Sequence, residues 1–156
     1  MLSNVTEITS CRAKAQRRMG NIPHSMKNSP PSVLIVDDEA LIRWTLTETL
    51  GDRGYLVTEA ENGRGALAAI AEAEEPFDVV LLDFRLPDSA DLRLLERIRS
   101  LAPDARIIMM SAHNSPELIQ GAEALGAYRV VNKPFEIESM AALVKQAHAD
   151  SVGGGS

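Results

Sequence analysis

Five polar side chains stand directly after short apolar runs of the chain, and their chemical types complement one another. They are three carboxylates, one hydroxyl and one ammonium: Asp37, Asp38, Asp83, Ser111 and Lys133. Three carboxylates at close range repel one another unless a cation lies among them, and Mg²⁺ typically takes one or two carboxylates together with water and phosphate oxygens. An aspartate can also act as a nucleophile and form an aspartyl phosphate, whose charge a metal ion and a lysine neutralise. The set indicates magnesium-dependent phosphoryl transfer.

Each of these residues, taken alone, also has an ordinary structural explanation. Asp38 and Ser111 are suited to cap the helices that follow them, and Lys133 is suited to a solvated surface position. That explanation accounts poorly for the joint pattern. Asp83 is the best candidate nucleophile because it follows residues 79–82, the most apolar run, which predicts the central strand of a sheet.

The elements that must position these side chains alternate regularly along the chain. Strands are predicted at residues 33–36, 55–59, 79–82, 107–110 and 128–131, and helices at 40–50, 65–73, 92–101, 116–125 and 137–148. Five such units predict an α/β fold, a doubly wound five-stranded parallel sheet with helices on both faces. The carboxyl ends of its strands share one edge, where ligands bind. The five polar residues are therefore expected to converge.

The ends of the chain differ in composition from this unit. Residues 1–32 hold five basic residues against one glutamate, a balance of +4. The net charge of the whole chain is −6, so the remaining residues carry −10. We expect a disordered basic leader at 1–32, a folded domain at 33–149 and a flexible tail or linker remnant at 150–156. Because the folded part is so acidic, direct nucleic-acid binding is not expected.

Several other classes of protein are disfavoured. Cys11 is the only cysteine, which excludes an internal disulfide and a cysteine-based metal site. The three histidines lack ligand spacing, and no phosphate-binding loop, G-x-S-x-G elbow or G-x-G-x-x-G fingerprint occurs. No apolar run approaches the ~20 residues that span a bilayer, so a cytoplasmic chain without a membrane segment is expected.

Four motifs, in this order and spacing, resemble the receiver domains of two-component response regulators. They are Val-Leu-Ile-Val-Asp-Asp-Glu at 33–39, Val-Val-Leu-Leu-Asp-Phe-Arg-Leu-Pro-Asp at 79–88, Met-Ser-Ala-His at 110–113, and Gly-Ala-Tyr at 126–128 followed by Lys-Pro-Phe at 133–135. The segment after Ser111 is similar to receivers of the nitrogen-regulation activator group. The resemblance implies a flavodoxin-like (βα)5 fold and a signalling switch that accepts a phosphoryl group on Asp83 from a sensor histidine kinase or a histidine phosphotransfer protein.

The resemblance also implies a role for each residue of the site. Asp38, Asp83 and the backbone carbonyl of Arg85 would bind Mg²⁺ directly, and Asp37 would hold it through water. Lys133 would bind the phosphoryl group, and its bond to Pro134 is expected to be cis.

Ser111 and Tyr128 are implied to be a switch pair, in which the Ser111 hydroxyl moves inward and the Tyr128 ring turns into the space it leaves. The signal would pass through a face made of the fourth helix (116–125), the fifth strand (128–131) and the fifth helix (137–148). Homodimerisation through this face is left open by the sequence.

Two positions depart from the family pattern. Asp91 stands where many relatives carry a glycine, so we expect a modified loop there. Arg85 places a long cation beside the mouth of the pocket and is expected to affect the lifetime of the aspartyl phosphate.

Three alternatives accompany this interpretation. A phosphohydrolase would need a second carboxylate shortly after the nucleophile, and position 85 is an arginine. The chain is therefore expected to catalyse only its own phosphorylation and dephosphorylation. A pseudo-receiver that acts by binding alone, and a receiver excised from a longer transcriptional regulator, remain the other two.

Overall fold

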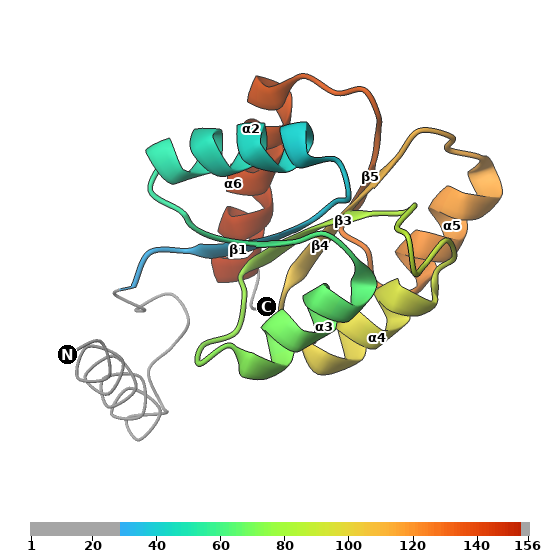
Figure 1. Cartoon of the computed structure of the whole chain (residues 1–156), viewed down its shortest axis with the longest axis horizontal. Helices are drawn as coiled ribbons and strands as arrows, with labels where there is room; N and C mark the ends of the chain where they lie inside the picture. Colours follow the sequence, from blue (N-terminus) through green and yellow to red (C-terminus); the bar gives the residue numbers. More distant parts are fainter. Residues whose placement is uncertain (1–28, 154–156) are drawn as a thin grey trace.

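Strands and helices alternate along the chain in a computed structural model that describes residues 29–153 (Figure 1). The strands are β1 (Ser32–Val36), β2 (Leu56–Ala60), β3 (Val79–Asp83), β4 (Arg106–Ser111) and β5 (Arg129–Asn132). The helices are α2 (Ala40–Asp52), α3 (Gly63–Glu72), α4 (Arg93–Leu101), α5 (Pro116–Ala124) and α6 (Ile137–Gly153). Most of the predicted leader, residues 1–28, and the last residues of the predicted tail, 154–156, lie outside the described residues.

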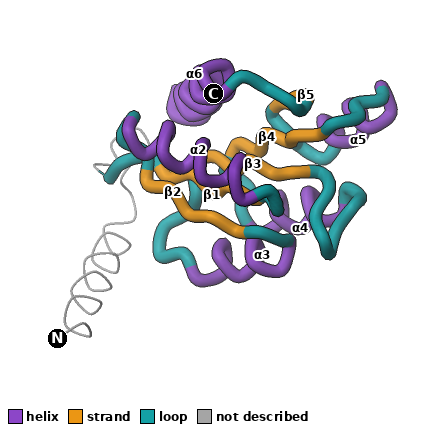
Figure 2. The backbone as a smooth tube through the Cα atoms, turned by 45° about the horizontal axis from the view of Figure 1, so that its top comes forward, coloured by secondary structure: helices purple, strands orange, loops and turns teal. Residues whose placement is uncertain are grey.

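All five strands pair in parallel in one sheet, in the order β2-β1-β3-β4-β5. The chain runs outward from β1 to β2 and then returns to β3, so the strand order reverses between β1 and β3. Figure 2 shows α2 and α6 on one face of the sheet and α3 and α4 on the other. The doubly wound parallel sheet expected from the sequence is confirmed, with β3 at its centre.

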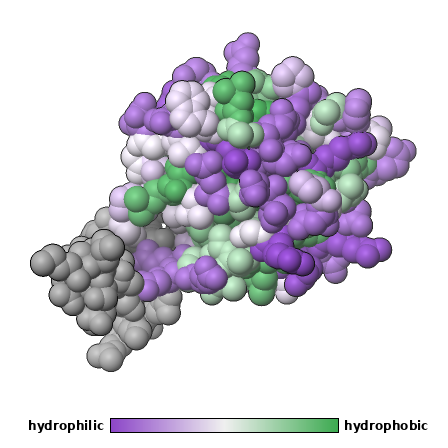
Figure 3. Space-filling view, in the orientation of Figure 1, coloured by the Kyte–Doolittle hydropathy of each residue, from purple (hydrophilic) through white to green (hydrophobic). Residues whose placement is uncertain are grey.

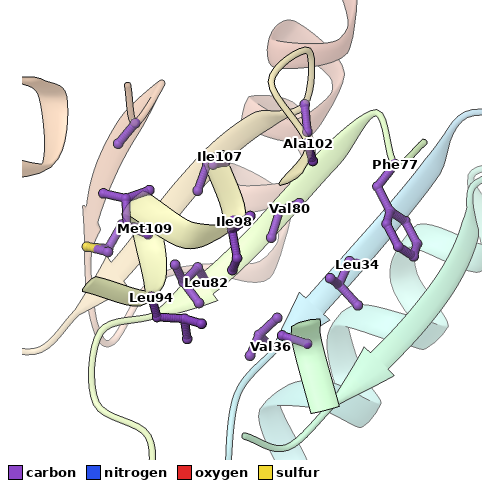
Figure 4. Packing of buried hydrophobic residues seen from close by; sticks show 14 of the residues in the cluster. Leu34, Val36, Phe77, Val80, Leu82, Leu94, Ile98, Ala102, Ile107 and Met109 are labelled. Carbon is purple, nitrogen blue, oxygen red and sulfur yellow. The ribbon is translucent and has the colours of Figure 1, made fainter. Parts of the chain in front are cut away.

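The central strands are apolar throughout because both of their faces are covered. Residues of β1 and β3 alternate between two buried clusters, and every residue of β3 is buried. Leu34, Val36, Val80 and Leu82 contribute to the cluster beneath α3 and α4, which Figure 4 shows from close by. Shortening one of these buried leucines to alanine costs about 2–5 kcal/mol of stability in proteins generally. This packing fixes the strand ends that carry the polar residues.

The last helix is longer than the sequence pattern indicates. We predicted its end at His148, whereas α6 continues to Gly153 and so includes residues 150–153 of the expected tail. The side chain of Asp150 accepts a hydrogen bond from the Tyr128 hydroxyl, and its backbone carbonyl accepts one of 3.3 Å from Arg106 Nη2. These contacts hold the end of the helix on the sheet, which the local sequence could not reveal.

The surface of the folded unit mixes apolar and hydrophilic residues. Figure 3 shows apolar patches scattered among hydrophilic side chains on the face that it presents. Among residues 29–153, no helix is both long enough and apolar enough to cross a bilayer.

Candidate functional site

The predicted polar residues meet at the carboxyl edge of the sheet. Asp83 ends β3, Ser111 ends β4, and Lys133 directly follows β5. Parallel pairing sets Asp83 opposite Met110 and Ser111 opposite Asn132, which brings these strand ends to one level. A pocket of about 280 Å³ opens there, and its lining includes Asp38, Glu39, Asp83, Arg85, Ser111 and Lys133. The convergence expected from the sequence is therefore observed.

Three carboxylates form an acidic cluster at this pocket. Oxygen atoms of Asp37, Asp38 and Asp83 lie within 4.8 Å of one another. Asp37 is fully buried and Asp83 is 5% exposed, whereas Asp38 faces solvent. Burial and the adjacent charge of Asp37 raise the pKa of Asp83 to about 6, against the opposing effects of Lys133 and of the Arg85 backbone N–H. Closely spaced carboxylate oxygens that destabilise one another, with one open to solvent, fit a hard divalent cation such as Mg²⁺.

Lys133 is the cation that contacts this cluster. Its Nζ lies 2.8 Å from Asp37 Oδ2, 3.0 Å from Glu39 Oε1 and 3.2 Å from Asp83 Oδ2. Burial works to lower the pKa of Lys133, but the contacts with these carboxylates outweigh it and hold the pKa above its usual value. The bond between Lys133 and Pro134 is cis, as expected. The lysine is thus charged and held against the candidate nucleophile.

The backbone around Asp37 is held by a network that the sequence analysis missed. The Asp37 N–H donates to the Ala60 carbonyl, and Asp37 Oδ1 accepts a 2.8 Å hydrogen bond from the Glu39 N–H. Arg43 donates from Nη1 to the Asp37 carbonyl at 2.7 Å and from Nε to Glu59 Oε1 at 3.2 Å. Arg43 therefore ties the start of α2 and the edge strand β2 to the acidic cluster. Its signal in the sequence was only an arginine five residues after Asp38.

Asp88 anchors the loop that follows β3, a second contact that the sequence analysis missed. Its two carboxylate oxygens accept hydrogen bonds from the N–H groups of Gly63 at 2.8 Å and Arg64 at 3.0 Å, at the N-terminus of α3. These bonds lower the pKa of Asp88. A helix N-terminus stabilises a carboxylate in this way. The partner lies 25 positions away in the chain, so no local pattern could show the pairing.

The loop at Asp91 is accommodated without the backbone conformation that favours glycine. No non-glycine residue in the described part of the chain has a positive φ. Asp91 Oδ1 instead accepts a 2.9 Å hydrogen bond from the Arg93 N–H at the start of α4. The side chain that replaces glycine therefore supports the next helix.

Ser111 lies where it was predicted, but the structure does not bring Tyr128 to it. Ser111 is 4% exposed, and its Oγ contacts the backbone of His113 at 3.3–3.4 Å. The Tyr128 N–H donates to the carbonyl of Ile107, at the opposite end of β4 from Ser111. Ile107 and Ser111 are four residues apart, which corresponds to about 13 Å along the strand.

The Tyr128 ring lies beside two arginines at that far end. Arg106 and Arg129 are 5.6 and 5.5 Å from its centroid, and its hydroxyl bonds to Asp150. The predicted pairing of Ser111 with Tyr128 is therefore wrong in this register. Val130 of β5 pairs with Met109 and packs against the same buried cluster. It is therefore the apolar β5 residue nearest to Ser111 on that face of the sheet.

Comparisons with known proteins agree with this arrangement. Residues 33–145 match the family model described as the response regulator receiver domain. The chain is 39% identical over 115 residues to the DNA-binding transcriptional regulator NtrC of Salmonella typhimurium, covering 74% of this chain and 24% of that protein. It is 36% identical to the sporulation initiation phosphotransferase F of Bacillus subtilis, covering 73% of this chain and 90% of that protein.

Solved structures show the same likeness. A CheY-like receiver domain protein from Methanospirillum hungatei superposes with a TM-score of 0.76 at 29% identity, covering 81% of this chain and all of that one. A response regulator protein from Burkholderia pseudomallei, solved with a phosphorylated aspartic acid, a calcium ion and citrate, has a TM-score of 0.66 at 28% identity and covers 81% of this chain and 75% of that one. The chain thus spans about a quarter of the NtrC protein that it matches and most of several shorter proteins.

Proposed function

The chain belongs to the response regulator receiver domain family, and its receiver resembles those of the NtrC group; from this we propose that it is a phosphorylation-dependent signalling switch acting in the cytoplasm, with Asp83 as the phosphoacceptor. The observation that carries the proposal is the position of Asp83. It ends the central strand, lines the pocket, contacts a charged lysine, and has carboxylate oxygens of Asp37 and Asp38 within 4.8 Å of its own.

The chemistry follows from the groups around Asp83. One carboxylate oxygen attacks the phosphorus of a phosphohistidine in a sensor histidine kinase or a histidine phosphotransfer protein, the P–N bond breaks, and the imidazole leaves with the electron pair and takes up a proton. The attacking carboxylate must be ionised, which a pKa of about 6 allows at neutral pH. Lys133 neutralises charge on the phosphoryl oxygens, and the Ser111 hydroxyl donates to one of them.

The acidic cluster is suited to hold Mg²⁺ for this reaction. Asp38, Asp83 and the backbone carbonyl of Arg85 would bind the ion, with Asp37 contacting it through water. When bound, the ion supplies positive charge that offsets the carboxylates and the phosphoryl oxygens. The domain catalyses only its own phosphorylation and dephosphorylation in this proposal.

The output is proposed to pass through the surface formed by α5, β5 and α6. This surface adjoins β4, which ends at Ser111, and it is a candidate homodimer interface. The acidic balance outside residues 1–32 favours protein partners over nucleic acid. The NtrC relative of Salmonella typhimurium is a DNA-binding transcriptional regulator, and this chain covers 24% of it, so a role as the receiver of a longer regulator is a second form of the same proposal.

Intact-mass analysis after treatment with acetyl phosphate and Mg²⁺ tests the proposal. The wild-type chain should gain one phosphoryl group, Asp83→Asn should gain none, and the control Asp88→Asn, which removes a carboxylate outside the pocket, should be labelled like the wild type. Equal labelling of wild type and Asp83→Asn would refute the assignment. An unlabelled wild type would favour a pseudo-receiver that acts by binding alone.

A further inference from the structure

Glu39 contacts the pocket lysine although it is not part of the acidic cluster. Its Oε1 lies 3.0 Å from Lys133 Nζ, and its side chain is 59% exposed, whereas that of Lys133 is 10% exposed. Glu39 stands at the N-cap position of α2, yet its side chain makes no capping hydrogen bond to that helix. Its carboxylate is therefore engaged with Lys133 rather than with the helix that it precedes.

Three carboxylates share the ammonium group of Lys133. They lie at 2.8, 3.0 and 3.2 Å, and a lysine ammonium has three N–H donors. Its Nζ donates hydrogen bonds to Glu39 and Asp83, whereas its contact with Asp37 is an ion pair. A phosphoryl oxygen on Asp83 must therefore share this lysine with Glu39, the other carboxylate to which it donates a hydrogen bond.

The three carboxylates differ in how readily they can release the lysine. Asp37 is fully buried and has the shortest contact, so losing Lys133 would leave an uncompensated charge inside the protein. Asp83 is the residue that carries the incoming group. Glu39 is the most exposed of the three, so water can solvate its carboxylate after the contact breaks.

We propose that Glu39 is a positioning residue that holds Lys133 in the resting state and competes with the phosphoryl group for it. This inference rests on the proposed function. Glu39 also places a negative charge beside the position of an incoming anion, so its carboxylate opposes phosphorylation in two ways. The same charge attracts a divalent cation to the pocket.

The proposal predicts opposite changes in the binding of two ligands. In Glu39→Gln, which keeps the size of the side chain, Mg²⁺ should bind more weakly. Beryllofluoride, an anion that mimics a phosphoryl group on aspartate, should bind about three- to tenfold more tightly at saturating Mg²⁺, the effect of removing one like charge from a half-solvated site. A purely structural role for Glu39 would not move the two affinities in opposite directions.

Mg²⁺ affinity is measured by calorimetry, and beryllofluoride affinity by fluorine NMR at saturating Mg²⁺. The matched control is Glu61→Gln, because Glu61 is exposed, follows β2 at the same edge of the sheet, and has no contact with Lys133 among the described residues. This control should leave beryllofluoride affinity within about twofold of wild type.

The outcomes separate this inference from the proposed function. Unchanged or weaker beryllofluoride binding by Glu39→Gln, with normal binding by the wild type, would overturn the role of Glu39 alone. Equal tightening in Glu61→Gln would also overturn it, since the effect would then arise from net charge at the edge. Failure of the wild-type chain to bind beryllofluoride would instead overturn the proposed function.

Discussion

Asp83→Asn should stabilise the metal-free protein, although it removes the proposed phosphoacceptor. The pKa of Asp83 is raised from 3.8 to about 6, chiefly by burial and then by the charge of Asp37. Each pH unit between the two pKa values corresponds to about 1.4 kcal/mol, so the ionised carboxylate destabilises the fold by about 3 kcal/mol. Because the amide of the substituted side chain meets Lys133 less favourably than the carboxylate does, the expected gain at pH 8 is about 1–3 kcal/mol.

The sign of this effect depends on pH in a defined window. Because the folded-state pKa lies above the unfolded value, Asp83 is protonated in both states below pH 3.8, and its destabilising charge develops as the pH rises towards 6. The advantage of Asp83→Asn should therefore be nearly absent at pH 4 and complete above pH 7. Urea unfolding followed by circular dichroism, in the presence of a chelator, measures it at both ends of the window.

Asp88→Asn is the matched control because the pKa of Asp88 is shifted in the opposite direction. Hydrogen bonds from the Gly63 and Arg64 backbones lower it, so this carboxylate stabilises the fold above its unfolded pKa, and that contribution is lost as the pH falls through the folded pKa. Asp88→Asn should destabilise the protein at pH 8. A gain for Asp83→Asn that is equal at pH 4 and pH 8, or no gain at pH 8, would refute the electrostatic reasoning.

Three further predictions follow from the same contacts. Carbon NMR of the metal-free wild type should find Asp83 titrating near pH 6. Lys133→Met should raise that midpoint, because the charge and the hydrogen bond of Lys133, which both lower the pKa of Asp83, are lost. An unchanged midpoint would contradict this. Arg43→Met should cost about 1–3 kcal/mol in urea unfolding, since the Asp37 carbonyl loses its donor, and a loss below about 0.5 kcal/mol would contradict the network. Tyr128→Phe should speed amide exchange at the end of α6 and leave Asp83 labelling unchanged, whereas loss of labelling would restore the pairing with Ser111.

Much of the site could be predicted from sequence because its residues stand at strand ends. An apolar run fixes a buried parallel strand, and the polar residue that stops the run must then lie at the shared edge, which is how Asp83 and Ser111 were placed. Side-chain partners could not be predicted in this way. Glu39 reaches Lys133 across 94 positions of the chain, and only the folded sheet shows that contact.

The error at Tyr128 has a physical cause. The resemblance to receiver domains implied a ring close to Ser111, but it did not fix which residue of the last strand lies opposite Ser111 in the parallel sheet. The pairing of Ser111 with Asn132 places Tyr128 at the amino-terminal end of β5, where its hydroxyl supports the end of α6. A shift of two residues along a strand moves a side chain by nearly 7 Å, about 3.3 Å for each residue.

The most direct test of the central claim is to locate the phosphoryl group. After treatment with acetyl phosphate and Mg²⁺, borohydride reduces an aspartyl phosphate to homoserine, and peptide mass spectrometry identifies the position that has changed. We predict homoserine at position 83 alone, and none when Mg²⁺ is removed with a chelator. Homoserine at position 37 or 38, or modification at position 83 that is equally strong without Mg²⁺, would contradict the account.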